Sequence, residues 1–458
     1  MPNTDHSCGT DRTSFNANVS RRDQVEYYWP AWRAAAAGGK IESVMCSCAH
    51  PNLCFVFKQR LTRRRLVDNA VNDVPSCGNG FALNTVLRGN FSFDGVVVSD
   101  CGAIGDGAFS HYIQEHFDSD PKQQARLGVQ SGCDLNCGSF YTGHVNDAVA
   151  ANILPQSDVD AALVRIWTHA FALGLMDAPD DTRNPFRSLE RFGPRQVDTP
   201  ESRALSLSAA EQAMCLLKNE NGLLPLKLGT TKVALIGPNL NVTTEMLSIY
   251  ASEGNQLVLE HSPWSAFKRG GAIITATAAG CNDTQGDGQS DIGCLEDSGF
   301  AAAEAAAKTA DVVLLFVGLR PAAFTPKNAS SDAWEGEGRD RIRTELPGLQ
   351  PELVRRVAAA NNKTVLILIH GGPLSIEDQV PQVAAILDAS YPGQLGGDAI
   401  FNTVFGMNPP AGRLTTTWYN KDFVDTRPIT DMSLRGRGGI TYVSAPHASE
   451  QSLASRVG

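Results

Sequence analysis

The sequence contains no long hydrophobic run. Within its 458 residues, the longest apolar stretches are 312–317 and 365–369, whereas a helix needs ~20 apolar residues to cross a bilayer. These two stretches have the length of buried strands. The first residues, 1–6, show no basic segment followed by an apolar one, so no signal peptide is visible in this chain. We therefore predict that no membrane is among its partners.

The composition also lacks the biases of several protein classes. Apolar residues make up 42% and charged residues 19%, which excludes collagen-like, coiled-coil and wholly disordered chains. The net charge is −10. An acidic chain of this kind argues against nucleic acid or an anionic membrane as the main partner. The length suggests two or three globular domains.

Motifs for metals and nucleotides are missing as well. The 11 cysteines include no paired Cys-x-x-Cys with a histidine motif, so we predict no metal and no cofactor. His370 precedes two glycines and is interpreted as a strand-end residue rather than a ligand. Nucleotide binding stays open only as a weak alternative, because the turn at 237–239 is not a Gly-x-Gly-x-x-Gly turn.

Features of secreted proteins are present despite the absent leader. Many cysteines accompany Asn-x-Ser/Thr sequons, which are found at Asn18, Asn90, Asn241, Asn282, Asn328 and Asn362. We expect a secreted, extracellular and glycosylated parent protein, of which this chain lacks the true N-terminus.

The first part of the chain, residues 1–176, reads as alternating strands and helices. Two β-branched or apolar runs predict buried parallel strands, at 41–46 and 93–100. Helical patterns occur at 24–37, 83–88, 123–130 and 157–175. In the last of these, Ser157 is a plausible N-cap with Asp160 at the third helical position. Such a βα repeat is typical of a barrel or a doubly wound sheet.

The second part predicts an open α/β domain over 202–418. Residues 177–201 lack apolar periodicity and are interpreted as a linker, and residues 419–458 as an irregular tail. A helix is expected at 202–219. Further elements are expected as strands at 232–236, 272–277, 311–317, 364–369 and 384–387, and as helices at 300–309, 350–360 and 396–405. An open parallel sheet places its ligand crevice beyond the carboxyl ends of its strands.

Two acidic positions are candidates for chemistry. Asp100 ends the Val-Val-Val-Ser run, where the catalytic groups of a βα barrel project. It could equally be a helix N-cap. Glu335 and Glu337 alternate with Gly336 and Gly338 in a segment of the second domain, which could equally be a solvated loop. A pair of carboxylates fits glycoside hydrolysis, with one nucleophile and one acid/base.

Several motifs in collinear order resemble those of glycoside hydrolase family 3, in particular its fungal and plant β-xylosidases. They run from Thr13 to Arg437 and occur at 15–20, 43–47, 69–77, 98–104, 335–341, 391–397, 412–414 and 430–434. The resemblance implies a partial (β/α)8 barrel, of which the last three strands remain, followed by an open parallel α/β sandwich domain. It also implies that the fibronectin-like domain common in the family is absent.

The resemblance further implies a retaining exo-β-glycosidase that releases xylose from the ends of xylo-oligosaccharides or xylan by double displacement. Asp100 would be the nucleophile, and Glu335 the acid/base with Glu337 as runner-up. Met45 and Cys101 would contact the sugar, and Cys101 stands where β-glucosidases of the family carry Trp. That difference favours xylose or arabinose over glucose. Alternatives are a non-catalytic sugar- or protein-binding remnant, and α-L-arabinofuranosidase or β-glucosidase specificity.

One segment departs from the family pattern. Residues 48–68 interrupt a motif that should run on from 47 to 69, and they carry five basic residues and one acidic residue. We interpret them as a translated intron that replaces a pocket Tyr. A genuine loop insertion and a basic targeting patch are the alternatives. A mature transcript that retains these bases would reject the intron.

Truncation and cysteine pairing complete the expectations. Three strands cannot close a barrel, so we expect impaired activity. We expect disulfides Cys133–Cys137 and Cys281–Cys294. Without Cys48 and Cys54 the cysteine count stays odd, which suggests a partner in the missing part.

Overall fold

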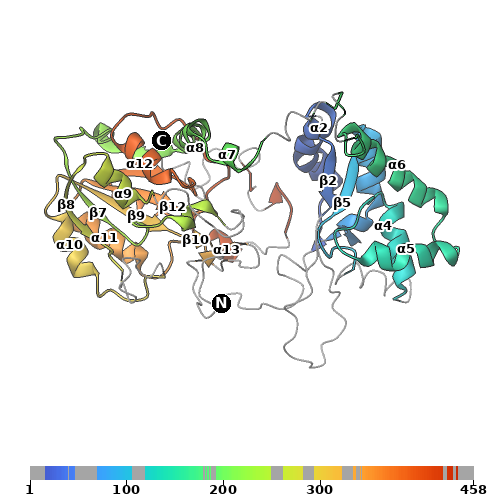
Figure 1. Ribbon diagram of the computed structural model, residues 1–458. Coiled ribbons are helices and arrows are strands. Elements are labelled where there is room, and N and C mark those ends of the chain that lie inside the picture. Colours follow the sequence, from blue (N-terminus) through green and yellow to red (C-terminus); the bar gives the residue numbers. More distant parts are fainter. Residues whose placement is uncertain are drawn as a thin grey trace. The chain divides into compact units, whose positions relative to one another are not determined.

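A computed structural model describes most of the chain (Figure 1). The described residues are 16–39, 41–46, 70–105, 119–178, 192–248, 261–281, 293–321, 334–336, 343–426 and 431–436, together with 181, 183, 184, 186, 341, 440 and 441. They belong to two compact units, residues 1–192 with 427–439, and residues 193–426 with 440–458. The division falls within the stretch predicted as a linker. The segment 48–68 lies outside the described residues, so its origin stays a prediction.

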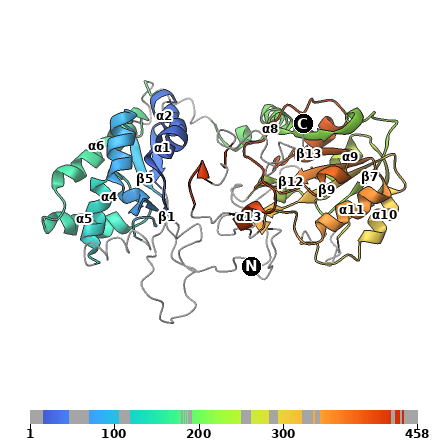
Figure 2. The same ribbon diagram turned by 180° about the vertical axis from the view of Figure 1, so that it is seen from behind.

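Three short parallel segments lie side by side at the centre of the first unit. Strand β2 (Ser43–Cys46) pairs in register with β5 (Val96–Ser99), so that Cys46 lies opposite Ser99. A single parallel bridge joins Val98 to Leu135. The two predicted strands are therefore found, and residues 134–136 run beside them as a third. The rear view shows β5 among the helices of this unit (Figure 2).

Helices cover one face of these strands. In the list that follows, η denotes a 3-10 or π helix. In chain order the remaining elements are β1 (Asn16–Ala17), α1 (Arg21–Asp23), η1 (Gln24–Tyr28), α2 (Trp29–Gly38), β3 (Ala70–Val71), β4 (Val74–Pro75), η2 (Ser76–Gly78), η3 (Phe81–Asn90), α4 (Pro121–Gln130), α5 (Phe140–Ala150) and α6 (Gln156–Ala172). Val44, Val97, Leu83 and Ile104 belong to one buried cluster between the strands and helices. The unit thus has its own small core.

The predicted N-cap of α6 is wrong. The helix begins at Gln156 with Pro155 as N-cap, and Ser157 already lies inside its first turn. The backbone of Pro155 is extended, with φ −61° and ψ 136°. This φ is also a helical value, so the chain leaves the helix through the extended ψ. Because proline disfavours the helical conformation of the residue before it, the helix begins here without a capping hydroxyl.

The second unit is built on one six-stranded sheet. Its strands are β6 (Cys215–Asn219), β7 (Lys232–Ile236), β8 (Ile273–Ala278), β9 (Val312–Gly318), β12 (Thr364–Ile369) and β13 (Ala385–Asp388). The spatial order is β6-β13-β12-β9-β7-β8, and all neighbours are parallel except β13 and β6. The five parallel strands therefore have a doubly wound order, with its switch point between β7 and β9.

The antiparallel edge strand corrects two expectations. The predicted helix 202–219 ends early, because α8 covers Pro200–Ala213 and β6 follows directly. Met214 between them is extended, with ψ 123°. Pairing with the edge of β13 satisfies the backbone of residues 215–219, and this tertiary contact outweighs their helical propensity. The sheet is consequently mixed rather than wholly parallel.

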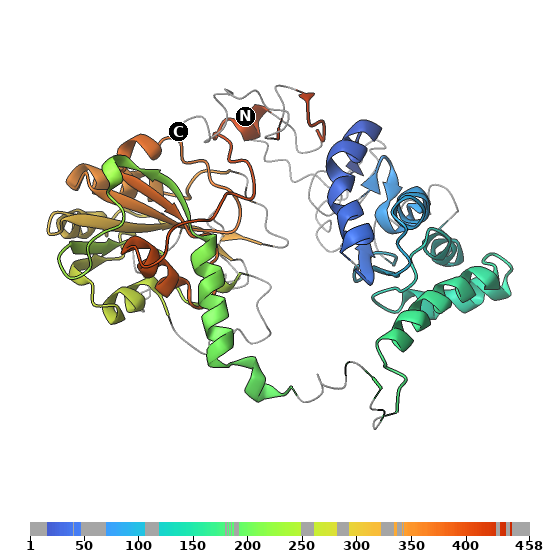
Figure 3. The ribbon, with the colours of Figure 1, turned by 90° about the horizontal axis from the view of Figure 1, so that it is seen from above.

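Helices cover both faces of this sheet. One buried cluster joins the sheet to α10 (Phe300–Ala307) and α11 (Gln350–Ala360), and the other joins it to α8, α9 (Pro263–Arg269) and α12 (Gly396–Val404). Figures 1 and 3 show these two helical layers on opposite sides of the strands. Strand β9 is buried along its whole length. Short elements complete the unit, namely α7 (Pro194–Val197), η5 (Glu220–Gly222), η6 (Thr244–Leu247), β10 (Arg320–Pro321), β11 (Trp334–Glu335), η8 (Val380–Gln382) and α13 (Phe423–Thr426).

No helix in the described ranges is both long enough and apolar enough to cross a membrane.

A glycine at the switch point provides a test of this packing. Gly237 follows β7 with φ 123°, and a Cβ there would lie 2.0 Å from the Phe316 carbonyl oxygen. We expect Gly237→Ala to destabilise the unit by about 3 kcal/mol or more, through left-handed strain and backbone overlap. Gly229→Ala is the control, since its φ is also positive but the space around it is open. It should cost about 1 kcal/mol. Hydrogen exchange of peptides from β9 and β12 at increasing urea concentrations measures the loss of stability in both variants. Equal losses in the two variants would contradict the packing around Gly237.

Candidate functional site

Asp100 stands at the carboxyl end of β5, at the point where the strand ladder stops. Its backbone N–H donates to the carbonyl of Cys46 at 2.9 Å, so the chain is still tied to β2. Its carboxylate accepts a hydrogen bond from the Cys101 N–H at 2.7 Å, and the residue is half-buried. The carboxylate is therefore held by the backbone of the following turn and keeps access to solvent.

Met45 shares a sheet face with Asp100. Side chains alternate along a strand, so Val98 and Asp100 point to one side of β5, and Met45 lies opposite Val98 on β2. Met45 is 57% exposed, and Leu135 on the third segment is 47% exposed. The structure thus brings two predicted site residues to one open face, where Met45 and Leu135 form an apolar surface beside Asp100.

The opposite face is held together by a buried charge network around Asp134. The Asp134 side chain is fully buried, and one of its oxygens accepts from Arg88 at 2.6 Å and from the Val97 N–H at 2.9 Å. The other oxygen contacts Arg165 of α6 at 2.7 Å. Burial lowers the pKa of Arg88, and the charge of Asp134 opposes that shift. The network fixes the third strand segment against β5.

Removal of this carboxylate should be costly. We expect Asp134→Ala to destabilise the first unit by about 3–5 kcal/mol, because two arginines would face each other without a counter-charge. Asp147→Ala, at an exposed position of α5, is the matched control and should change stability by less than about 0.5 kcal/mol. Thermal and urea unfolding of the two variants give the comparison. A loss for Asp134→Ala no greater than for the control would contradict this role.

The cysteines next to the site pair differently from the prediction. Cys101 is bonded to Cys137, and Cys133 is a free, buried thiol, so the predicted Cys133–Cys137 pair is wrong. Residues 134 and 135 are hydrogen-bonded to β5, and this pairing brings Cys137 beside Cys101, with the two Cα atoms 4.4 Å apart. The predicted Cys281–Cys294 pair is confirmed. Any contact of Cys101 with a sugar stays a prediction.

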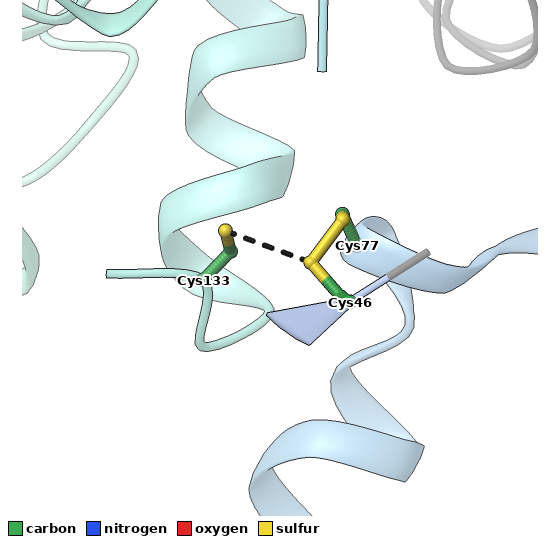
Figure 4. Close-up of side chains that lie close together, drawn as sticks. All are labelled: Cys46, Cys77 and Cys133. Carbon is green, nitrogen blue, oxygen red and sulfur yellow. Dashed lines mark hydrogen bonds between the residues drawn. A yellow bond between two sulfur atoms is a disulfide. The ribbon is translucent and has the colours of Figure 1, made fainter. Parts of the chain in front are cut away.

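A third disulfide lies next to the free thiol. Cys46 is bonded to Cys77, and the Cys133 sulfur lies 3.8 Å from that of Cys46 (Figure 4). The three sulfurs are buried and form the one cluster in the described ranges that could hold a metal by proximity alone. Two of the three are joined in the disulfide and are not thiolates, which soft metals require. We assign no metal to this cluster.

Burial should make Cys133 unreactive. It raises the pKa of the Cys133 thiol to about 12, and it also raises the pKa of Cys215. A raised pKa leaves the thiol protonated, and so unreactive, until the pH approaches that value. We expect neither peptide to be alkylated by iodoacetamide in the folded chain at pH 8, and both to be alkylated in urea. Peptide mass spectrometry measures this. Rapid labelling of Cys133 in the folded chain would contradict its burial.

Glu335 of the second unit lies in a pocket of hydrogen-bond donors. It is the second residue of β11, which pairs over two residues with β10 at the end of β9. Its Oε1 accepts from the Gly371 N–H and from the Tyr391 hydroxyl, the latter at 2.8 Å. Its Oε2 accepts from the Gly372 N–H at 2.9 Å and lies 3.7 Å from Arg341 Nε. The side chain is 13% exposed.

The neighbours of Glu335 follow the ends of β12 and β13. Gly371 and Gly372 come just after β12, and Tyr391 comes after β13. Burial raises the pKa of Tyr391, and the adjacent charge of Glu335 raises it further. The phenol therefore remains a hydrogen-bond donor. Glu337, the runner-up for the acid/base, lies outside the described residues.

His370 supports the same corner of the sheet. It is buried, its Nδ1 lies 2.7 Å from the Gly372 carbonyl oxygen, and its Nε2 lies 3.1 Å from the Asp388 carboxylate. Its ring also contacts Trp418, with centroids 5.1 Å apart. This agrees with the interpretation of His370 as a strand-end residue.

Sequence reasoning missed the residues that support these positions. Tyr391 begins the family motif at 391–397, but nothing in the motif indicates its contact with Glu335. Asp134, within Cys-Asp-Leu-Asn-Cys, could have been flagged as a charge between two apolar positions. Its arginine partners lie 46 and 31 residues away, so no local signal could have identified them.

Family models match both parts of the chain. The glycosyl hydrolase family 3 C-terminal domain matches residues 214–443, and the family's N-terminal domain matches residues 65–169.

Curated proteins with similar sequences include β-xylosidases. The chain is 36% identical over 441 residues to beta-D-xylosidase 1 of Arabidopsis thaliana, covering 95% of this chain and 50% of that protein. It is 32% identical over 446 residues to exo-1,4-beta-xylosidase xlnD of Aspergillus niger, covering 94% and 49%. The chain thus spans about half the length of the curated relatives it matches.

Solved structures agree with this relationship. A family 3 exo-beta-xylosidase, XlnD, in complex with a xylobiose aziridine activity-based probe, matches with a TM-score of 0.76 and 28% identity, over 97% of this chain and 51% of that one. A beta-glucosidase from Listeria innocua matches with a TM-score of 0.70 at 23% identity, over 95% and 53%, which shows the fold alone. The chain belongs to glycoside hydrolase family 3.

Proposed function

We propose that this chain is the part of a retaining exo-β-xylosidase that carries both catalytic carboxylates, one in each unit. The observation that carries the proposal is the position of Asp100. It stands at the carboxyl end of a parallel strand, half-buried, on the same face as the exposed Met45. The relatives named above are xylosidases. We further propose that the three parallel segments belong to a (β/α)8 barrel, where this strand end is the site of catalysis.

In the proposed reaction, Asp100 attacks the anomeric carbon of a terminal β-xylosyl residue. A carboxylic acid from the loop that begins at Glu335 protonates the departing oxygen, and a covalent glycosyl-enzyme forms. The same group, now ionised, then deprotonates a water molecule that releases xylose with retained configuration. Glu335 and Glu337 are the candidates for this group. The reaction requires the two carboxylates to come within ~5–5.5 Å of each other.

A minimal substitution tests the nucleophile. We expect Asp100→Asn to lower turnover of 4-nitrophenyl β-xyloside by about 10⁴-fold or more, since the amide cannot form the glycosyl-enzyme. Asp94→Asn, an exposed carboxylate just before β5, is the matched control and should keep full activity. Incubation with a fluorinated xyloside should add one glycosyl group to the peptide that contains Asp100. Unchanged turnover in Asp100→Asn, or label on another residue, would reject the assignment.

The same assay separates the alternatives. Turnover of the arabinofuranoside or the glucoside in place of the xyloside would replace the proposed substrate. A chain that turns over none of the three would be a non-catalytic remnant. The exposed apolar face of Met45 and Leu135 is the feature that favours the non-catalytic alternative.

We also propose that the parent protein is secreted and glycosylated. Three disulfides in the described ranges support an oxidising compartment. Three sequon asparagines, Asn18, Asn90 and Asn362, are exposed and so accessible to a glycan.

A further inference from the structure

We propose that Glu335 is a positioning residue rather than the acid/base of the proposed reaction. Its carboxylate fastens residues 334–336 to the glycine pair after β12 and to Tyr391 after β13. This inference rests on the proposed function and revises the choice between the two glutamates of the loop.

The partners of Glu335 are all donors. Two backbone N–H groups, one phenol and one guanidinium surround its two oxygens. A general acid must carry a proton on an oxygen directed at the leaving group. Each Glu335 oxygen already faces at least one donor, and a proton added to either would meet another donor. The arrangement suits a side chain that binds these donors rather than one that passes a proton to a leaving group.

The glycine pair is shaped to this carboxylate. A Cβ at Gly371 would lie 2.8 Å from Glu335 Oε1, and a Cβ at Gly372 would lie 2.9 Å from Oε2. Any larger residue would push the side chain out. Because neither glycine has a Cβ, their two consecutive N–H groups form a seat that fits one carboxylate, here that of Glu335.

The strand pairing of this segment is short. The β10–β11 ladder covers only two residues on each side. The hydrogen bonds of Glu335 reach the residues that follow β12 and β13, so they join the segment to the ends of two strands of the six-stranded sheet. The chain continues directly from Glu335 into the rest of the loop. The hydrogen bonds of Glu335 therefore fix the position from which the next residues of the loop start.

Kinetics with two leaving groups distinguish a residue that anchors the loop, as a positioning residue does, from the catalytic acid/base. An acid/base variant loses most activity on poor leaving groups and is rescued by azide, whereas a misplaced loop slows all substrates alike. We expect Glu335→Gln in the full chain to lower kcat/KM about 10–100-fold on both 4-nitrophenyl and phenyl β-xyloside, by the same factor and without azide rescue.

Matched variants sharpen the comparison. Tyr391→Phe removes one donor to Glu335 and should give a smaller loss of the same kind, and the double variant should lose less than the product of the two single losses. Glu352→Gln, an exposed glutamate on α11, should change nothing. A Glu335→Gln loss that grows with the poorer leaving group, together with azide rescue, would overturn the proposal and make Glu335 the acid/base.

A second measurement does not depend on turnover. We expect Glu335→Ala to accelerate amide hydrogen exchange in the peptide that contains Gly371 and Gly372, because their N–H groups lose this acceptor, while Glu352→Ala leaves it unchanged. Absence of turnover in the unaltered chain would reject the proposed function, and the exchange result would still decide whether Glu335 is the anchor. Unchanged exchange in Glu335→Ala would reject the anchor whatever the activity.

Discussion

Strands that are hydrogen-bonded on both edges offer their ends for chemistry, and both candidate carboxylates lie at such ends. Asp100 ends β5, and the seat of Glu335 is made by residues that follow β12 and β13. The sheet behind Glu335 is tightly packed, as the full burial of β9 and β12 illustrates. A rigid strand end can hold a reacting group within the small tolerance that catalysis demands.

The two units support their strand ends by different means. In the first, a buried carboxylate, Asp134, pairs with two arginines and fixes the third strand segment beside β5. In the second, the buried pair His370 and Asp388 supports the corner that receives Glu335. In both cases polar side chains lie inside the protein, where a group left without its partner costs far more than at the surface. Each site thus depends on a polar network that does not touch substrate in the proposed reaction.

Much of the fold was predictable because its signals are local. Strand β12 and helix α11 were predicted with the bounds that the structure shows, since a continuous apolar run and a clear helical period identify them. The antiparallel β6 was not, because its conformation comes from pairing with β13 and overrides its own propensity. The disulfide of Cys101 with Cys137 was missed for a similar reason, as it joins segments 36 residues apart.

The sequence by itself determined the family and the two acidic positions, because both reside in short motifs whose order along the chain is sufficient. Only the tertiary structure decided what surrounds them. Met45 lies on the face of Asp100 because two strands pair in register, and Glu335 meets Gly371 and Tyr391 because the chain returns twice to the same sheet edge. Hydrogen bonds between distant segments leave no local pattern, so a motif can name a carboxylate without telling whether it reacts or anchors.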